Sequence, residues 1–255
     1  MARIFITGST DGLGLATART LLNGGDEVLL HARSRERASS LDELAPLAIG
    51  IVIGDLSRAS ETRELAAQVN AYGRMDAVIH NAGVYLSPGR VATPEGHSRT
   101  LAVNVLAPYI LTALIERPHR LIYLSSGMHR AASSNLQDID WTRRRWDASA
   151  AYSESKLYVS ALSTAVARQW TDVLSNSVDP GWVPTKMGGA GAPDDLAMGQ
   201  DTQGWLAVSP DPAIQVSGMY WHHRRPRKPA PEVTDADFQD KLTDKLAELT
   251  GITLF

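Results

Sequence analysis

The sequence predicts an α/β fold: a doubly wound parallel sheet of about seven strands, with helices on both faces. Two observations predict this class. Short apolar runs alternate along the chain with stretches of helical spacing, which is typical of parallel strands joined by helices. The runs are apolar throughout, which indicates strands that are buried on both faces. Neither a repeat nor a low-complexity linker divides the 255 residues, so we predict a single domain over 1–255.

The apolar runs place the strands. They lie at 4–7, 27–32, 49–54, 76–80, 120–125, 175–179 and, with the weakest pattern, 214–220. The first helix follows the first strand, because Leu13, Thr17 and Leu21 keep helical spacing before Gly24 and Gly25 end it. The same spacing predicts helices at 57–72, 95–115, 150–170 and 235–249.

Composition excludes several classes of protein. The 25 basic and 28 acidic residues give a net charge of −3, so no broad basic face is available for nucleic acid. The absence of cysteine excludes disulfides and thiolate chemistry. No apolar run approaches the roughly 20 residues of a membrane span, and the start has no signal-peptide pattern. We therefore expect a cytoplasmic protein with neither a nucleic-acid partner nor a membrane span.

A glycine-rich turn follows the first strand directly. Positions 7–14 read Thr-Gly-Ser-Thr-Asp-Gly-Leu-Gly and open the first helix. Glycines permit a tight turn and let backbone N–H groups approach a pyrophosphate at a helix N-terminus. The predicted contacts with a dinucleotide are Gly8, Ser9, Thr10, Gly12, Leu13 and Gly14.

The end of the second predicted strand indicates which dinucleotide binds. NAD sites usually carry an acidic residue there to hold the ribose hydroxyls, whereas this chain has Arg33. An arginine can bind a ribose 2′-phosphate through charge-assisted hydrogen bonds. The alternative is a solvated loop arginine. We predict the phosphate contact, and hence NADP(H) in preference to NAD(H).

A tyrosine and a lysine share one helix face further along the chain. Tyr152 and Lys156 stand four positions apart, so both can project into the same space. An ammonium group beside a phenol lowers the phenol pKa and suits it to acid–base chemistry. Any helix can carry such a pair by chance, so the neighbouring motifs decide whether the pair has a catalytic role.

Seven motifs in order resemble the short-chain dehydrogenase/reductase family, in its single-domain branch of about 250 residues. They are the glycine turn, Asp55-Leu56, Asn81-Ala82-Gly83, Asn104, Ser125-Ser126, Tyr152 with Lys156, and 179–185. The resemblance implies a Rossmann-type fold and hydride transfer between a nicotinamide and a carbonyl or alcohol.

The resemblance implies four catalytic residues. Ser126 would hydrogen-bond the substrate carbonyl oxygen, and Tyr152 would donate or accept the proton. Lys156 would bind the nicotinamide ribose and lower the tyrosine pKa. Asn104 would hold a water of the proton relay, although bridging backbone groups is the alternative for this side chain.

The resemblance also implies the rest of the cofactor site. Asp55, followed by Leu56, would bind the adenine amino group, with a helix N-cap as the alternative for Asp55. Asn81 would support the central strand beside the cofactor. The remaining positions are Ala82, Gly83, Pro180, Gly181, Val183 and Thr185, of which the last two would hold the nicotinamide carboxamide.

Two segments depart from the usual family pattern. Tyr152 follows Ser126 by 26 positions, about twice the usual distance, so 128–150 is an insertion. This spacing is similar to that of retinol-dehydrogenase-like and protochlorophyllide-reductase-like proteins, whose substrates tend to be apolar. Within the insertion we interpret 143–145 as a solvated arginine face rather than an anion clamp. The small residues of 186–205 predict a substrate lid that leads into a helix.

The remaining expectations concern histidines, tryptophans and assembly. His80 is expected to pack inside the fold, and the histidines of 222–225 lack the partners of a metal site. All six tryptophans follow residue 140. We expect pocket walls at Trp141, Trp146, Trp182 and Trp205, and ordinary packing at Trp170 and Trp221. The family implies a homodimer or a homotetramer, and the insertion leaves that choice open.

The sequence thus predicts an NADP(H)-dependent oxidoreductase for a small apolar or aromatic carbonyl or alcohol. One alternative is a nucleotide-sensing protein of the same fold without catalysis, which would often lack the tyrosine or the lysine. Another is a sugar-nucleotide epimerase or dehydratase, but the seventy residues after Thr185 leave little room for its larger C-terminal domain.

Overall fold

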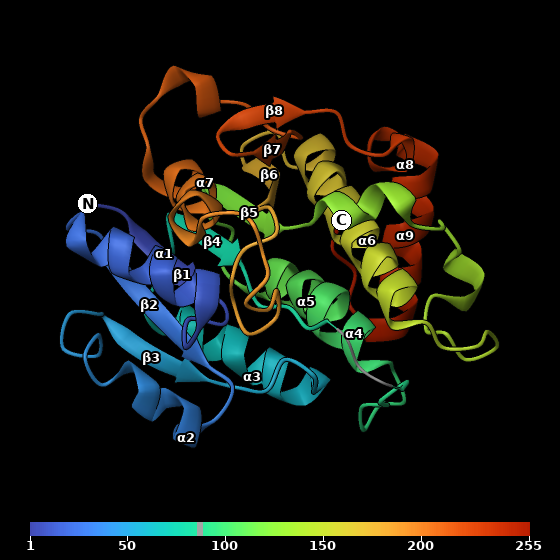
Figure 1. The fold of residues 1–255 in the computed structure, drawn as a ribbon, viewed down its shortest axis with the longest axis horizontal. Coiled ribbons are helices and arrows are strands. Elements are labelled where there is room, and N and C mark those ends of the chain that lie inside the picture. Colours follow the sequence, from blue (N-terminus) through green and yellow to red (C-terminus); the bar gives the residue numbers. More distant parts are fainter. Residues whose placement is uncertain (86–88) are drawn as a thin grey trace.

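One sheet runs through the molecule (Figure 1). The computed structural model describes residues 1–85 and 89–255, and in them the strand order is β3-β2-β1-β4-β5-β6-β7-β8. The strands are β1 Arg3–Ile6, β2 Glu27–Ala32, β3 Gly50–Ile53, β4 Ala77–His80, β5 Arg120–Leu124, β6 Leu174–Asp179, β7 Tyr220–His222 and β8 Arg225–Arg227. All neighbours pair in parallel except β7 and β8, which confirms the predicted doubly wound parallel sheet.

Helices cover both faces of the sheet. Their bounds are α1 Gly12–Asn23, α2 Arg35–Ala38, α3 Ala59–Asn70, α4 Arg99–Leu101, α5 Ala107–Leu114, α6 Ala148–Gln169, α7 Leu196–Val208, α8 Pro231–Thr234 and α9 Ala236–Thr250. A core cluster on one face joins the sheet to α1 and α7. The cluster on the other face joins it to α3, α5, α6 and α9. Strand order reverses between β1 and β4, where sheets of this class bind their ligands.

Strand β1 shows why the strands are apolar throughout. Ile4 and Ile6 belong to the core cluster under α1 and α7, whereas Phe5 belongs to the cluster on the opposite face. All three side chains are fully buried. Because successive side chains of a strand point to opposite faces, a strand covered on both sides favours apolar residues throughout. Strand β6 departs from this pattern, because Ser175, Asn176 and Ser177 are buried in it.

The last part of the sheet differs from the expectation. Ile214 lies in a short 3-10 helix, Pro212–Ile214, and the strand predicted at 214–220 begins only at Tyr220. A hairpin through His223 and Arg224, at φ 47° and 57°, then adds β8. Every residue of β8 is exposed, so its sequence has no apolar pattern to predict it. Its central proline is typical of an edge strand.

The insertion folds as two 3-10 turns, Gly127–Ala131 and Leu136–Asp138, followed by loop. The interpretation of 143–145 as a solvated face is wrong for Arg144. Its guanidinium makes two hydrogen bonds to Glu154, of 2.8 and 2.9 Å, and two to Asp138, of 3.1 Å to the carboxylate and 2.9 Å to the carbonyl. Its side chain is 26% exposed, while that of Glu154 is 2% exposed. The arginine therefore fastens the insertion to α6.

None of the helices in the described residues is both long and apolar enough to span a membrane.

Two buried histidines should make the fold sensitive to acid. Burial lowers the pKa of His31 to about 4 and that of His80 to about 3. The unfolded chain protonates both near pH 6.5, so protons favour unfolding once the pH falls below that value. We expect the free energy of unfolding to decrease from pH 6.5 towards 4, by about 2 kcal/mol for each histidine at pH 5.

Urea denaturation at pH 7.5 and 5.0 measures this decrease. The His80→Leu variant should lose about 2 kcal/mol less than the wild type between the two pH values. His119 is exposed, so His119→Leu should keep the wild-type difference. If His80→Leu loses as much unfolding free energy between pH 7.5 and 5.0 as the wild type, burial does not lower the pKa of His80 as stated.

Candidate active site

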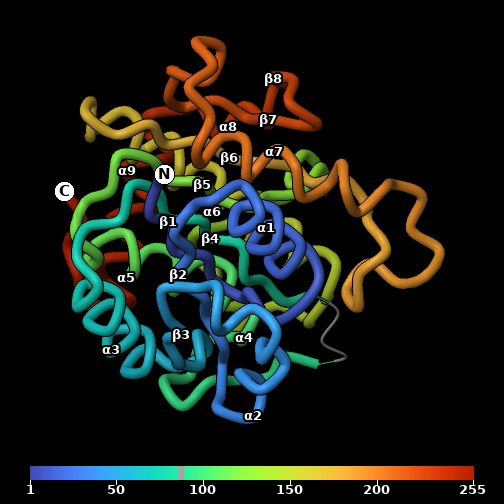
Figure 2. The backbone as a smooth tube through the Cα atoms, turned by 90° about the vertical axis from the view of Figure 1, so that its left-hand side faces the viewer, coloured from blue at the N-terminus to red at the C-terminus, as the bar shows by residue number. Residues whose placement is uncertain are grey.

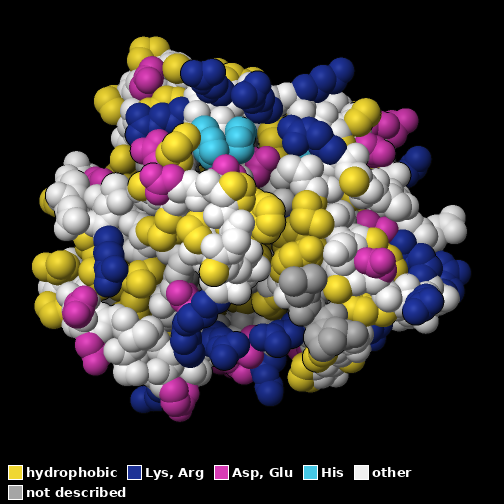
Figure 3. All heavy atoms as spheres, in the orientation of Figure 1, with side chains coloured by type: hydrophobic (Ala, Val, Ile, Leu, Met, Phe, Trp, Pro, Cys, Tyr) yellow, Lys and Arg dark blue, Asp and Glu magenta, His cyan; other side chains and the backbone are white. Residues whose placement is uncertain are grey.

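A large cavity opens at the carboxyl ends of β1, β2, β4, β5 and β6. Its volume is about 1030 Å³, which lies at the upper end of the range for ligand pockets, roughly 300–1,000 Å³. It extends from Arg33 and Asp55 at one end to Ser126 and Tyr152 at the other. In Figure 3 apolar side chains gather at the centre of the face seen in Figure 1, with Lys and Arg side chains below them.

The glycine turn forms one wall of this cavity. Gly8 and Gly12 have positive φ angles of 69° and 51°, which favour glycine. Asp11 caps α1 by accepting a hydrogen bond of 2.8 Å from the N–H of Gly12. Thr10 and Leu13 also line the cavity, so most of the predicted turn residues meet there.

Two predicted turn residues stabilise the turn instead of lining the cavity. Ser9 is fully buried, and its hydroxyl donates to the carbonyl of Ile6 at 2.6 Å. A Cβ on Gly14 would collide with the carbonyl oxygen of Gly8 and the side chain of Asn81. Neither belongs to the described cavity lining.

The buried His31 supports the same turn. Its Nδ1 accepts a hydrogen bond of 2.8 Å from the N–H of Gly8. Its Nε2 lies 2.8 Å from the carbonyl oxygen of Gly54. Because a carbonyl can only accept, the proton of the neutral ring sits on Nε2. This histidine joins the turn to the end of β3.

Two arginines stand at the far end of the cavity. Arg33 is exposed there. Arg37 also lines the cavity, donates to the Thr10 hydroxyl at 3.2 Å and pairs with Asp11 at 3.5 Å. The sequence reasoning missed Arg37. Ser34 caps α2, so Arg37 lies within the first turn of a helix that returns to the cavity.

Asp55 and Leu56 line the cavity beside these arginines. Asp55 Oδ1 accepts hydrogen bonds from the backbone and hydroxyl of Ser57, at 2.9 and 2.8 Å. The N-cap alternative is wrong, because the N-cap of α3 is Arg58 and no side chain caps that end. Asp55 instead closes the turn that precedes the helix.

The segment after β4 joins the two central strands. Asn81 donates from its side chain to the carbonyl of Thr7 at 2.9 Å, and the N–H of Ala82 donates to the Thr7 hydroxyl at 3.0 Å. A Cβ on Gly83 would lie 3.4 Å from Asn104 Oδ1 and 3.5 Å from Lys156 Nζ. The three residues 81–83 all line the cavity.

Asn104 bridges backbone groups, which is the alternative that the sequence left open. It lies in a π-helical stretch, Ala102–Leu106, between α4 and α5. Its side chain donates to the carbonyl of Val84 at 3.0 Å, accepts from the N–H of Val84 at 2.8 Å and donates to the Ser155 hydroxyl at 2.9 Å. Asn104 thereby fixes the cavity wall at Val84, beside Lys156.

Ser126, Tyr152 and Lys156 meet at the near end of the cavity. Lys156 Nζ donates a hydrogen bond of 2.7 Å to the carbonyl of Leu124, and lies 5.5 Å from the centre of the Tyr152 ring. Asp147 caps the N-terminus of α6. The capped helix therefore presents both side chains to the end of β5.

Burial controls the acidity of this pair. It lowers the pKa of Lys156 to about 8. It raises the pKa of Tyr152, and a hydrogen bond with Ser126 opposes that rise. The lowering of the Tyr152 pKa that the resemblance implies for Lys156 stays a prediction. The ammonium group lies 5.5 Å from the centre of the ring and is hydrogen-bonded to the Leu124 carbonyl.

The segment after β6 forms the opposite wall. Pro180, Gly181, Val183 and Thr185 line the cavity, as does Trp182. Trp182 is 59% exposed, and its indole N–H donates a hydrogen bond of 2.8 Å to the carbonyl of Gly188.

Three of the tryptophans predicted as pocket walls lie elsewhere in the described structure. Trp141 and Trp146 pack edge to face in the insertion, and Trp205 packs against Trp221. They are wrong as pocket walls, because interactions within the insertion and between α7 and β7 hold them. The packing predicted for Trp170 and Trp221 is confirmed by their burial.

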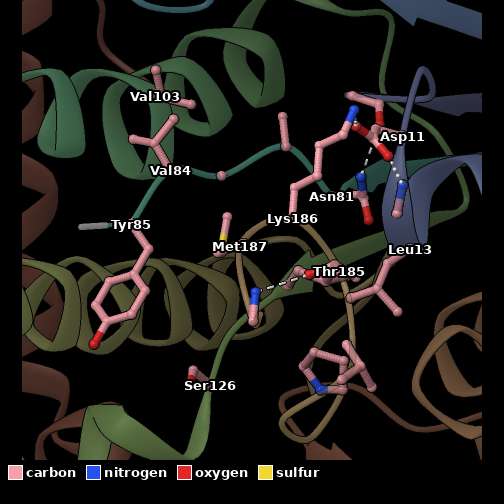
Figure 4. Close-up of a pocket in the computed structure, with 18 of the residues that line it drawn as sticks. Asp11, Leu13, Asn81, Val84, Tyr85, Val103, Ser126, Thr185, Lys186 and Met187 are labelled. Atoms are coloured by element: carbon pink, nitrogen blue, oxygen red, sulfur yellow. Dashed lines mark hydrogen bonds and ion pairs between the residues drawn. The ribbon is translucent and has the colours of Figure 1, made fainter. Parts of the chain in front are cut away.

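The predicted lid is a loop followed by a helix. Figure 2 shows the segment between β6 and α7 as an orange loop that projects from the fold. Asp195 caps α7, which begins at Leu196 as the sequence indicated. Lys186 reaches across the cavity to Asp11 at 2.5 Å (Figure 4). One ion pair therefore joins the lid to the glycine turn.

Apolar side chains surround the space in front of Tyr152. The Tyr85 ring lies 4.4 Å from the Tyr152 ring, centre to centre. Sequence reasoning missed these walls, because they belong to no motif. They are Val84, Tyr85, Val103, Met128 and Met187.

Histidine and carboxylate side chains form no metal-binding group of three in the part of the chain that the structure describes. The rings of His222 and His223 stack on each other at 3.9 Å in the β7–β8 hairpin. His80 is buried, stacks on Tyr123 and lies 3.2 Å from the Thr112 hydroxyl, so its expected packing role is confirmed.

Comparison with known proteins identifies relatives along the whole chain. Residues 2–195 match the family model of short chain dehydrogenases. The chain is 42% identical to the short-chain dehydrogenase chyC of Penicillium rubens, over 100% of this chain and 99% of that protein. It is 30% identical to human retinol dehydrogenase 13, over 98% of this chain and 84% of that protein.

Solved structures share the fold. A protein from Mycobacterium paratuberculosis superposes with a TM-score of 0.84 at 24% identity, over 100% of this chain and 95% of that one. A short chain dehydrogenase from Burkholderia cenocepacia, solved in complex with NADP, has a TM-score of 0.69 at 20% identity, over 87% of this chain and 95% of that one. The protein belongs to the short-chain dehydrogenase/reductase family of oxidoreductases.

Proposed function

We propose that the protein is an NADP(H)-dependent oxidoreductase that transfers a hydride between nicotinamide and the carbonyl or alcohol carbon of a small apolar or aromatic substrate. The observation that carries this proposal is one cavity with Ser126, Tyr152 and Lys156 at one end and two arginines at the other. A ligand that extends along the whole cavity would meet a proton donor and a phosphate site together.

The residues present fit a nicotinamide dinucleotide. Gly8 and Gly12 line the cavity at the N-terminus of α1, where backbone N–H groups can bind a pyrophosphate. A Cβ on Gly12 would approach the Thr185 side chain to 3.2 Å, and would narrow the passage between the two ends. Val183 and Thr185 stand where a carboxamide would meet both a backbone group and a hydroxyl.

The bound cofactor supplies or accepts the hydride. Ser126 orients the substrate by donating a hydrogen bond to the carbonyl oxygen, and Tyr152 transfers its hydroxyl proton to the same oxygen as negative charge develops there. Because burial raises the Tyr152 pKa, the phenol is protonated at neutral pH, as reduction requires. Lys156, with a pKa of about 8, holds a positive charge beside it.

A panel of ketones, aldehydes and quinones tests the proposal, with NADPH oxidation as the readout. We expect turnover with apolar and aromatic carbonyl compounds. An enzyme that binds NADPH and reduces none of these classes would contradict the proposed function.

The choice of cofactor should depend on Arg33. Replacing it with alanine should raise the Kd for NADPH about tenfold or more, since a charge-assisted hydrogen bond contributes roughly 1.5–3 kcal/mol. The Kd for NADH should stay within about twofold, because NADH has no 2′-phosphate. Fluorescence titration measures both constants.

Arg35 provides the matched control. It is exposed on the same segment and lies outside the described lining of the cavity, so Arg35→Ala should leave both constants unchanged. Arg37→Ala should weaken NADPH binding in the same direction as Arg33→Ala. Equal weakening of NADPH and NADH by Arg33→Ala would refute the phosphate contact.

A further inference from the structure

A buried carboxylate stands beside the predicted substrate oxygen. Asp179 ends β6, and Ser126 follows the end of the neighbouring strand β5. The N–H of Ser125 donates to the carbonyl of Val178 at 2.7 Å, so the next residue on each strand reaches the same edge of the sheet. Adjacent strands lie about 4.8 Å apart, which sets the spacing between groups bound to Ser126 and to Asp179.

One oxygen of this carboxylate has a partner and the other faces the cavity. Oδ1 accepts a hydrogen bond of 3.0 Å from the N–H of Gly181. Oδ2 lies 3.7 Å from Nδ1 of His222, which is beyond hydrogen-bonding distance. The buried Tyr220 hydroxyl, whose pKa Asp179 helps to raise, lies near the same carboxylate and makes no hydrogen bond of ordinary length with the described residues. The Asp179 side chain is 11% exposed and lines the cavity.

A glycine keeps the space in front of Oδ2 open. A Cβ on Gly127 would lie 3.2 Å from this oxygen, so a side chain there would crowd the carboxylate. Gly127 itself lines the cavity directly after Ser126. The open space therefore continues from the substrate-binding hydroxyl to the carboxylate.

Electrostatics give this arrangement a function. The negative charge of Asp179 opposes ionisation of Tyr152, whose pKa it helps to raise. It would also oppose the negative charge that develops on a substrate oxygen during reduction. Oδ2 accepts no hydrogen bond of ordinary length from the described residues, and a hydrogen-bond donor on the substrate would lessen the repulsion.

We propose that Asp179 Oδ2 accepts a hydrogen bond from the substrate and thereby selects carbonyl compounds with a hydroxyl or N–H group on the first or second carbon beyond the carbonyl. This inference rests on the proposed function and adds a substrate class to it. Asp179 is in this role a specificity-determining residue.

Two matched ketones test the inference. In 2-hydroxyacetophenone a hydroxyl replaces the terminal methyl of propiophenone, and both carry a phenyl ring for the apolar walls. The wild-type kcat/KM with NADPH should be about tenfold or more higher for the hydroxyketone, because the hydrogen bond is made to a charged acceptor. In Asp179→Asn the amide oxygen keeps the bond from Gly181 and the NH₂ group replaces Oδ2. The ratio of the two kcat/KM values should then fall to about one.

Asp172→Asn is the control for loss of a carboxylate. Its side chain is 64% exposed, far outside the cavity lining, so the wild-type preference should persist. Equal efficiency of the wild type with both ketones, or a preference that survives in Asp179→Asn, would overturn the inference while the proposed function stands.

A binding measurement separates the two proposals. Calorimetry with the NADP⁺-saturated wild type should give 1-phenyl-1,2-ethanediol a Kd about tenfold lower than that of 1-phenyl-1-propanol. If no ketone is reduced, the proposed function fails, and tighter binding of the diol would still support the hydrogen bond. A diol that binds no tighter would overturn the inference. The wild-type measurements with the two ketones and the two alcohols test the inference even if Asp179→Asn fails to fold.

Discussion

Replacing Tyr152 with phenylalanine should lower kcat for carbonyl reduction by about 100-fold or more, the usual contribution of a positioned proton donor. The change removes one hydroxyl from the cavity and keeps the ring, which packs against Tyr85 at 4.4 Å. The Kd for NADPH should stay within about twofold of the wild type, because the arginines and the glycine turn remain. Single-turnover kinetics and fluorescence titration measure the two quantities.

Tyr158 offers a control on the same helix. It is buried, donates a hydrogen bond of 3.3 Å to the carbonyl of Asn135 and lies outside the cavity lining that the structure describes. Tyr158→Phe should therefore keep kcat close to the wild-type value. A Tyr152→Phe enzyme that retains most of its turnover would sink the proposed role of the tyrosine.

Local signals explain why much of the fold was predictable. The segment 186–205 was expected to lead into a helix, and the glycine turn was expected to open the first one. Asp195 caps α7 and Asp11 caps α1, because the first N–H groups of a helix need acceptors that few side chains provide. The buried strands were predictable from their apolar runs. Strand β8 was not, since Arg225–Arg227 lies at an exposed edge, where no core imposes a pattern.

The candidate site also has residues that the sequence predicts and residues that it does not. Residues tied to backbone geometry, such as Gly8 and Asn81, can be found from short motifs. Arg37 and Tyr85 became visible only once the fold brought their elements together at the cavity. Asp179 belongs to the motif at 179–185, but the sequence assigned it no role. Trp141 misled the prediction, because the position of a large ring depends on its tertiary partners rather than on its place in the sequence.

The role of Glu154, which lies between Tyr152 and Lys156 in the sequence, also depends on its tertiary partners. Two positions along a helix turn a side chain about 200° away, so Glu154 faces away from the cavity and towards the insertion. There it accepts two hydrogen bonds from Arg144 and one of 2.9 Å from the indole of Trp141. Trp141 has a φ of 56°, a costly backbone conformation for a large side chain. One carboxylate thus stabilises both an arginine and a strained turn.

Replacing Glu154 with leucine should lower the free energy of unfolding by about 3 kcal/mol, near the lower end for a broken buried ion pair. The low end applies because Arg144 keeps its bonds to Asp138 and part of its exposure to water. Urea denaturation measures the loss. Glu248 pairs with Lys245 at the surface, with 68% of its side chain exposed, so Glu248→Leu should change stability by less than about 1 kcal/mol. Similar losses in the two leucine variants would show that Glu154 does not fasten the insertion.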